Sequence, residues 1–146
     1  MQVELDLDLE KLTEFAFQMQ NKDKKGVEVS NIGGWQSDNV SEEKHEEFIK
    51  LKKEISQYLQ KYHLEVFRGV KFKENVMQNC DNMWVNINEK HHYNEWHIHP
   101  GSTLSGVYYI KHDNSNENGN ILFKNSIGSY KVSSEIVTIN PKSNML

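Results

Sequence analysis

Cysteine, proline and arginine are almost absent from this chain. It has one cysteine, Cys80, two prolines and a single arginine, Arg68. A lone cysteine excludes a disulfide framework and predicts a reducing compartment, for which the cytoplasm is the simplest choice. Because Arg68 is the single arginine, lysine supplies nearly all of the positive charge. Arginine is the side chain that binds carboxylates through two parallel hydrogen bonds, whereas lysine offers a point charge.

Long apolar runs and concentrated basic patches are missing as well. The first ten residues lack the basic start and the apolar stretch of a signal peptide. No apolar run approaches the length of a membrane span, so no contact with a membrane is expected. The net charge is -4 and acidic residues separate the lysines, which disfavours nucleic acid as a partner.

The N-terminal part, about residues 1–68, is typical of helices. Apolar residues recur at helical spacing within residues 8–20, and Asp8 is suited to cap the helix that they predict. A second helix is expected to run from a cap at Ser41 to about His63, because a second apolar stripe has the same spacing.

The segment between these helices contains an unusual pair of glycines. Gly33 and Gly34 permit a tight turn ahead of Trp35, and we expect a loop that buries this indole. A short strand is predicted just before it, at residues 27–29.

The C-terminal part, about residues 69–146, is typical of short strands separated by turns. The order of helices first and strands afterwards predicts an α+β, mainly β fold in one domain of residues 1–146, with an antiparallel sheet or jelly roll backed by the helices. Strands are expected at residues 83–88, 97–99, 104–111, 120–124 and 130–139, with turns at residues 89–93 and 100–101 and a loop at residues 112–119.

Two histidines stand two residues apart in one of these predicted strands. Because successive strand side chains point to opposite faces, Glu95, His97 and His99 share one face, and Trp96 and Ile98 share the other. Two imidazoles at this spacing can bind one metal ion, although a pair of surface histidines explains the spacing equally well. Imidazole suits iron, zinc, copper and nickel alike, so the ligand type does not choose the metal.

A third metal ligand is harder to find in the sequence. Glu95 and His99 lie ~13 Å apart along an ideal strand, too far for one ion to reach both. His91, His92 and His112 are candidates by residue type, but each lies in a predicted loop, where histidines are more often solvated.

Three motifs in the chain resemble one known family. They are Asn94-x-x-His97-x-His99-Pro100-Gly101-Ser102-x-Leu104-Ser105-Gly106-Val107-Tyr108-Tyr109-Ile110, Ser30-Asn31-x-Gly33-Gly34-Trp35-Gln36-Ser37 and Trp84-x-Asn86. Taken in their order along the chain, they resemble the motifs of putative 2-oxoglutarate/Fe(II)-dependent oxygenases of phages and marine bacteria, which are related to prolyl hydroxylases. The resemblance runs from about residue 28 to the C-terminus and implies a double-stranded β-helix (jelly-roll) core, Fe(II) as metal and 2-oxoglutarate as co-substrate.

The resemblance also implies roles for individual residues. His97 corresponds to the first iron ligand, and His99 stands where most of the superfamily has aspartate or glutamate. Tyr109 corresponds to a tyrosine that reaches the 2-oxoglutarate carboxylate, while its neighbour Tyr108 is expected to pack on the opposite side. Asn86 is expected to face the same cavity.

The C-terminus departs from the family pattern. Residues 140–146 resemble the turn and strand start that precede the family's last iron ligand, a histidine, and its carboxylate-binding arginine. Arg68 lies well before the metal strand and does not correspond to that arginine. We expect the chain to be a fragment that lacks the last core strands rather than a degenerate relative, and the open sheet edge would then invite pairing with another copy.

These observations predict a 2-oxoglutarate- and Fe(II)-dependent dioxygenase of unknown substrate, or a fragment of one. Its partners would be the small molecule 2-oxoglutarate and that substrate. Two alternatives stay open: a cupin-like metal or small-ligand binding module without oxygenase activity, and a non-catalytic phage structural protein whose histidines bind nothing.

Overall fold

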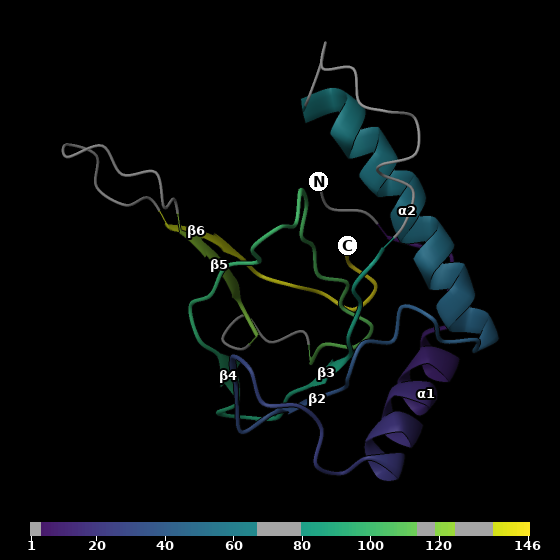
Figure 1. The fold of residues 1–146 in the computed structure, drawn as a ribbon, viewed down its shortest axis with the longest axis vertical. Coiled ribbons are helices and arrows are strands. Elements are labelled where there is room, and N and C mark those ends of the chain that lie inside the picture. Colours follow the sequence, from purple (N-terminus) through teal and green to yellow (C-terminus); the bar gives the residue numbers. More distant parts are fainter. Residues whose placement is uncertain (1–3, 67–79, 114–118, 125–135) are drawn as a thin grey trace.

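The fold combines two helices with three small antiparallel sheets in the part of the chain that the structure describes (Figure 1). The structure is a computed structural model, and it describes residues 4–66, 80–113, 119–124 and 136–146. Arg68, most of the predicted loop at residues 112–119 and the first part of the predicted strand at residues 130–139 lie outside these ranges. Neither described helix combines the length and the apolar character needed to cross a bilayer.

Helix α1 (Leu9–Lys22) confirms the first predicted helix and its cap. The backbone N–H of Lys11 donates to Asp8 Oδ1 at 3.1 Å, which satisfies one free N–H of the first turn and lowers the pKa of the Asp8 carboxyl group. The apolar stripe faces the protein interior, where Leu12, Phe15 and Ala16 are buried.

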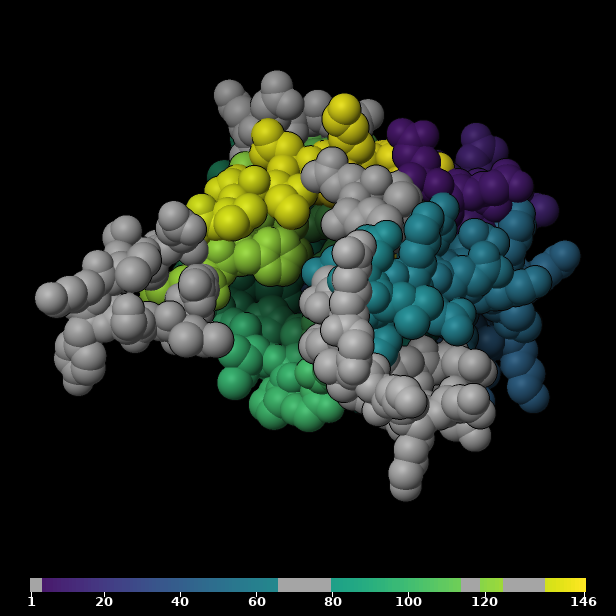
Figure 2. All heavy atoms as spheres, turned by 90° about the horizontal axis from the view of Figure 1, so that it is seen from above, coloured from purple at the N-terminus to yellow at the C-terminus, as the bar shows by residue number. Residues whose placement is uncertain are grey.

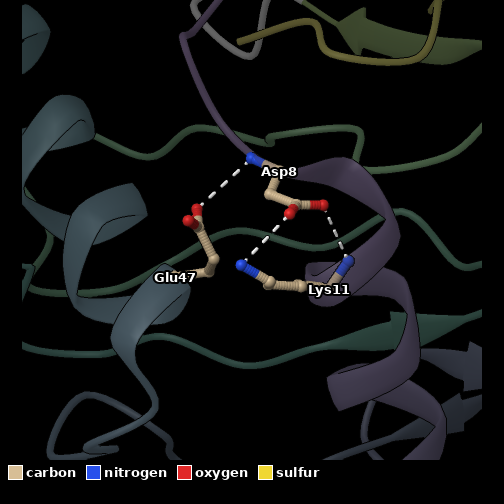
Figure 3. A network of polar contacts seen from close by, with 3 residues as sticks. All are labelled: Asp8, Lys11 and Glu47. Atoms are coloured by element: carbon tan, nitrogen blue, oxygen red, sulfur yellow. Dashed lines mark hydrogen bonds and ion pairs between the residues drawn. The ribbon is translucent and has the colours of Figure 1, made fainter.

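Helix α2 (Glu46–Val66) begins four residues later than a cap at Ser41 predicts. Ser41 does not cap it: this residue is buried in a turn, its N–H donates to Asn39 Oδ1, and its carbonyl accepts a hydrogen bond from Lys52 Nζ. The start of α2 is tied to the start of α1, because the backbone N–H of Asp8 donates to Glu47 Oε2 at 3.3 Å (Figure 3).

A small hydrophobic core lies between the helices and the sheets. Phe48 and Leu51 of α2 are 3% exposed and pack with the buried face of α1. Trp35 is buried as predicted, and its indole N–H donates to the carbonyl of Asp23 at 2.7 Å. The buried apolar residues of the described chain are Leu5, Leu12, Phe15, Ala16, Trp35, Val40, Phe48, Leu51 and Val85.

Two segments far apart in the sequence form a long, interrupted ribbon. Strand β1 (Asn31–Ile32) pairs with β4 (Tyr93–Asn94), and strand β2 (Trp35–Gln36) pairs with β3 (Asn86–Ile87), both antiparallel. Further backbone hydrogen bonds extend the pairing at both ends, so that residues 30–40 run against residues 83–95.

The glycine pair stands where this ribbon is interrupted. Gly33 has φ +79°, and a Cβ atom there would lie 2.6 Å from the His92 ring. A Cβ atom on Gly34 would lie 1.9 Å from the Asn88 amide oxygen. The side-chain amide of Asn31 donates to the carbonyl of Gly34 and stabilises the turn. The glycine pair therefore has a structural role here: it lets the backbone turn close to His92 and Asn88.

The C-terminal residues pair with one another and with the N-terminus. Strand β5 (Ile121–Lys124) pairs antiparallel with β6 (Ile136–Ile139). The N-terminal and C-terminal segments lie side by side (Figures 1 and 2), where Leu5 is hydrogen-bonded to the side chain of Asn144.

Several predicted strands are wrong in extent or absent. The strand at residues 83–88 shortens to β3, and residues 27–29 and 97–99 form no strand. The strand at residues 104–111 reduces to a single bridge between Tyr109 and Met145. A predicted segment becomes a strand only where a neighbouring strand accepts its backbone hydrogen bonds. Residues 27–29 and 97–99 have no ladder partner within the described chain, and residues 104–111 have one only at Tyr109. The described residues thus show helices with small antiparallel sheets, and the jelly roll stays a prediction.

Candidate metal centre

The two histidines lie in an irregular segment that directly follows strand β4 (Tyr93–Asn94). The backbone N–H of Glu95 donates to the carbonyl of Ser30 at 2.8 Å, and this bond anchors the start of the segment to the ribbon. The predicted turn follows His99: the N–H of Ser102 donates to the His99 carbonyl at 3.2 Å, and Gly101 has φ +83°. The segment is therefore held at both ends although it belongs to no sheet.

The rings of His97 and His99 meet each other. Their centroids are 4.9 Å apart and their planes are inclined at 86°. With metal–nitrogen bonds of about 2.1 Å, two imidazoles on one ion have centroids about 4.5 to 5.2 Å apart when the angle between the bonds is roughly 90° to 110°. The observed spacing lies within this range, and it is also the spacing of an edge-to-face contact between two rings.

The hydrogen bond of His97 fixes which ring nitrogen is free. His97 Nδ1 lies 2.7 Å from the carbonyl oxygen of Glu95. Because a carbonyl only accepts, Nδ1 carries the hydrogen, and Nε2 of the neutral ring keeps its lone pair for a metal. A metal-binding histidine usually donates its other ring N–H to a backbone carbonyl, a carboxylate or a water molecule.

The surroundings of the pair are open and aromatic. His97 is exposed, His99 is half-buried, and the ring centroid of Trp84 lies 5.6 Å from that of His99. Trp96 and Ile98 are 60% and 77% exposed. A ligand can therefore approach the two imidazoles from solvent.

Asn86 lies on the side of β3 that faces this pair. Val85 is buried and Ile87 half-buried, whereas Trp84 and Asn86 are exposed, as the predicted alternation requires. Since Trp84 contacts His99, its strand neighbour on the same face, Asn86, points to the same side of the ribbon.

Tyr109 is half-buried and is held by its backbone. Its N–H donates to the carbonyl of Met145 at 2.8 Å, and its carbonyl accepts from the N–H of Asn144 at 2.7 Å. Burial raises the pKa of the Tyr109 phenol above its ordinary value. The prediction that Tyr108 packs is confirmed, because this side chain lies against the core, and its hydroxyl donates to Asn144 Oδ1 at 2.7 Å.

The other histidines that were candidates by type lie in different surroundings. His91 is exposed, and His92 Nδ1 accepts the N–H of Glu89 at 2.9 Å. The expectation of a solvated ring is wrong for His112: its side chain is 8% exposed, and its ring meets the edge of Tyr109 at 6.4 Å. The contact between the rings of Tyr109 and His112 lies in irregular chain, so no periodic pattern in the sequence predicts it.

No third ligand accompanies the pair in the described residues, where no three side chains of histidine, cysteine, aspartate or glutamate come together. A cavity of about 480 Å³ lies elsewhere, between the end of α1 and the ribbon, and its lining includes Lys24, Glu28 and Gly33 but neither His97 nor His99. Within the described residues the predicted pair of histidines therefore has no third candidate ligand beside it.

Comparison with known families gives one match, and it covers this region. Residues 82–145 match the family model described as "Putative 2OG-Fe(II) oxygenase". The matched range includes Asn86, His97, His99 and Tyr109, so it supports the family that the motifs resemble, with Fe(II) and 2-oxoglutarate as the ligands that the family implies. No curated protein and no solved structure matches the chain.

Proposed function

We propose that the chain is a 2-oxoglutarate- and Fe(II)-dependent dioxygenase of still unidentified substrate, or the part of one that carries its first metal ligands. The observation that carries this proposal is the His97–His99 pair: its rings are 4.9 Å apart, and the pair lies inside the region that matches the oxygenase family. Bound Fe(II) with 2-oxoglutarate supplies the oxidising chemistry that couples decarboxylation of the co-substrate to hydroxylation of a substrate.

Each candidate residue has a role that its position supports. His97 and His99 hold the iron through neutral imidazole nitrogens, and the Glu95 carbonyl keeps the His97 ring in the required tautomer. Tyr109, whose phenol is protonated at neutral pH, donates to a carboxylate oxygen of 2-oxoglutarate in this proposal. Asn86 lies on the same side of the ribbon as Trp84 and offers an amide to the same ligand.

In this proposal, residues that the structure does not describe provide the third metal ligand and the cation that binds the carboxylate. The described ranges contain no arginine, and a lysine would offer a point charge without the paired hydrogen bonds of a guanidinium group. The proposed enzyme also has a jelly-roll core in one cytoplasmic domain, to which β5, β6 and the bridge at Tyr109 contribute antiparallel pairs.

The test measures succinate formed from 2-oxoglutarate by the purified protein, with Fe(II) or Zn(II) added under otherwise equal conditions. We expect succinate only with Fe(II), and its loss in His97→Ala and His99→Ala. His91→Asn is the matched control, because His91 is exposed and has φ 71°, a conformation that asparagine tolerates.

Three results would overturn the assignment in different ways. Protein that binds Fe(II) but neither binds nor converts 2-oxoglutarate would be a metal-binding module of the cupin-like kind. Protein that binds no metal would be non-catalytic. Equal loss of activity in His91→Asn and His97→Ala would show that histidine removal acts through the fold rather than through the metal.

A further inference from the structure

The cavity of about 480 Å³ lies between the end of α1 and the turn that joins β1 to β2. Its volume falls within the range of small-molecule sites, about 300 to 1,000 Å³. The motif with two glycines forms one wall, through Gly33, Gly34 and the buried indole of Trp35. The proposed function uses neither this cavity nor this motif, because the lining includes neither His97 nor His99.

The His92 ring supplies a fixed hydrogen-bond donor at the cavity wall. It lies over Gly33, where a Cβ atom would be 2.6 Å from Cδ2 of the ring and 3.1 Å from Nε2. Its Nδ1 accepts the backbone N–H of Glu89 at 2.9 Å, so the hydrogen of the neutral ring is on Nε2. His92 lines the cavity, and Nε2–H is therefore the group that it can offer to a ligand.

Charged side chains of both signs line the same cavity. Lys24 and Lys25 follow α1, and Glu28 comes shortly after them in the chain. Glu89 belongs to the turn between β3 and β4. None of the four forms an ion pair with another of the described residues, whose ion pairs involve other side chains. Their charges are therefore available to a ligand.

This combination of charges selects the chemical class of the ligand. Two ammonium groups and two carboxylates cancel, so a simple anion would meet the carboxylates and a simple cation would meet the ammonium groups. A small molecule with one carboxylate and one ammonium group can instead pair with both, and hydrogen bonds between charged groups are about twice as strong as neutral ones. Free α-amino acids carry these two groups on a single carbon atom.

We propose that this cavity is a binding site for a free α-amino acid. Lys24 and Lys25 pair with the carboxylate of the ligand, and His92 donates a further hydrogen bond to it. Glu28 and Glu89 pair with the ammonium group. The site is separate from the pair of histidines, so this inference goes beyond the proposed function and does not depend on it.

The test screens the free L-amino acids against the whole chain by saturation-transfer NMR without added metal, and calorimetry measures the affinity of those that bind. We expect at least one amino acid to bind. Its N-acetyl derivative and its carboxamide should each bind about ten- to a hundredfold more weakly, because each lacks one of the two charges.

The indole N–H signals locate the binding site. Trp35 lines the cavity, whereas Trp84 and Trp96 do not. The indole signal of Trp35 should therefore shift when the amino acid is added, and the other two should stay in place. Trp84→Phe and Trp96→Phe assign the signals, since both side chains are exposed and their replacement leaves the fold intact.

The double variant Lys24→Gln/Lys25→Gln should weaken binding of the amino acid about ten- to a hundredfold. Lys22→Gln/Lys90→Gln is the matched control, because it removes two ammonium groups that are close by in the sequence but do not line the cavity. All four lysines are exposed, so both double variants should fold, and the control should bind as tightly as the wild type.

Several results would overturn this inference. Absence of binding by every L-amino acid at millimolar concentration would exclude the ligand class. Equal affinity for the free amino acid and its two derivatives would exclude the charge pairing. Equal losses in the two lysine variants, or a shift of the Trp84 or Trp96 signal in place of that of Trp35, would place the binding elsewhere. None of these results bears on metal binding by the histidine pair, so the failure of this inference and that of the proposed function are distinguishable.

Discussion

Zn(II) should raise the melting temperature of this protein, and His97→Ala or His99→Ala should remove most of the rise. The two rings already lie at a spacing that suits one ion, 4.9 Å between centroids, so little rearrangement is needed for binding. Zn(II) is the appropriate probe because imidazole binds it well and it undergoes no redox chemistry.

The size of the effect follows from mass action. At free metal a hundred times the dissociation constant, binding to the folded state alone adds about 2.7 kcal/mol of stability. For a chain of 146 residues this corresponds to a rise of roughly 10 °C, at about 4 °C for each kcal/mol. Loss of a ligand should weaken binding at least about a hundredfold, because loss of an outer partner alone costs 10- to 100-fold, and ~0.4 kcal/mol of stabilisation then remains.

Differential scanning fluorimetry with and without Zn(II) measures this directly. His91→Asn is the control, since it removes an exposed histidine from the same part of the chain without changing the pair. A rise that persists unchanged in both His97→Ala and His99→Ala would refute the assignment of the metal to this pair. So would an equal loss of the rise in His91→Asn.

Three further predictions concern the fold. Leu12→Ala should lower the free energy of unfolding in urea by about 3 kcal/mol because Leu12 is 1% exposed, and Phe17→Ala on the same helix should lower it by less than about 1 kcal/mol because Phe17 is 46% exposed. Similar losses in the two variants would contradict the assignment of the buried face. Gly26 and Gly101 both have positive φ, but only at Gly26 would a Cβ atom lie 2.5 Å from a backbone carbonyl oxygen. Gly26→Ala should therefore lower the free energy of unfolding by roughly 1 to 3 kcal/mol more than Gly101→Ala, and equal losses would exclude that clash. Burial raises the pKa of Tyr108 to about 12, so the stability that depends on its neutral phenol should be complete below pH 10 and be lost between pH 10 and about 12. Absorbance titration of the phenols should show a transition near pH 12 that Tyr108→Phe removes, and persistence of that transition in the variant would assign it to another tyrosine.

The helices and the buried indole were predictable because their signals are local. The spacing of apolar residues placed Leu12 and Phe15 on the inner face of α1, and Asp8 capped that helix as expected. The start of α2 was not predictable from Ser41, because the hydrogen bonds of Ser41 with the Asn39 side chain and with Lys52 Nζ hold Ser41 in a turn instead of a cap.

The strands were predicted less well because alternation states which side chains share a face but not whether a partner strand exists. Residues 104–111 were expected to form a strand, yet only Tyr109 forms a bridge, and its partner Met145 is far along the chain. The burial of the His112 side chain was missed for the same reason, because it depends on contacts that no local pattern encodes.

By itself the sequence determined the residue types and spacing of the candidate site: two histidines two apart, and a tyrosine that the family motif marks. Those features are local, and they are the same in any conformation of the chain. Only the tertiary structure decided that the rings of His97 and His99 contact each other and that the backbones of Asn144 and Met145 hold that of Tyr109. These decisions depend on contacts between segments up to 139 residues apart, and such contacts form only when the whole chain has folded.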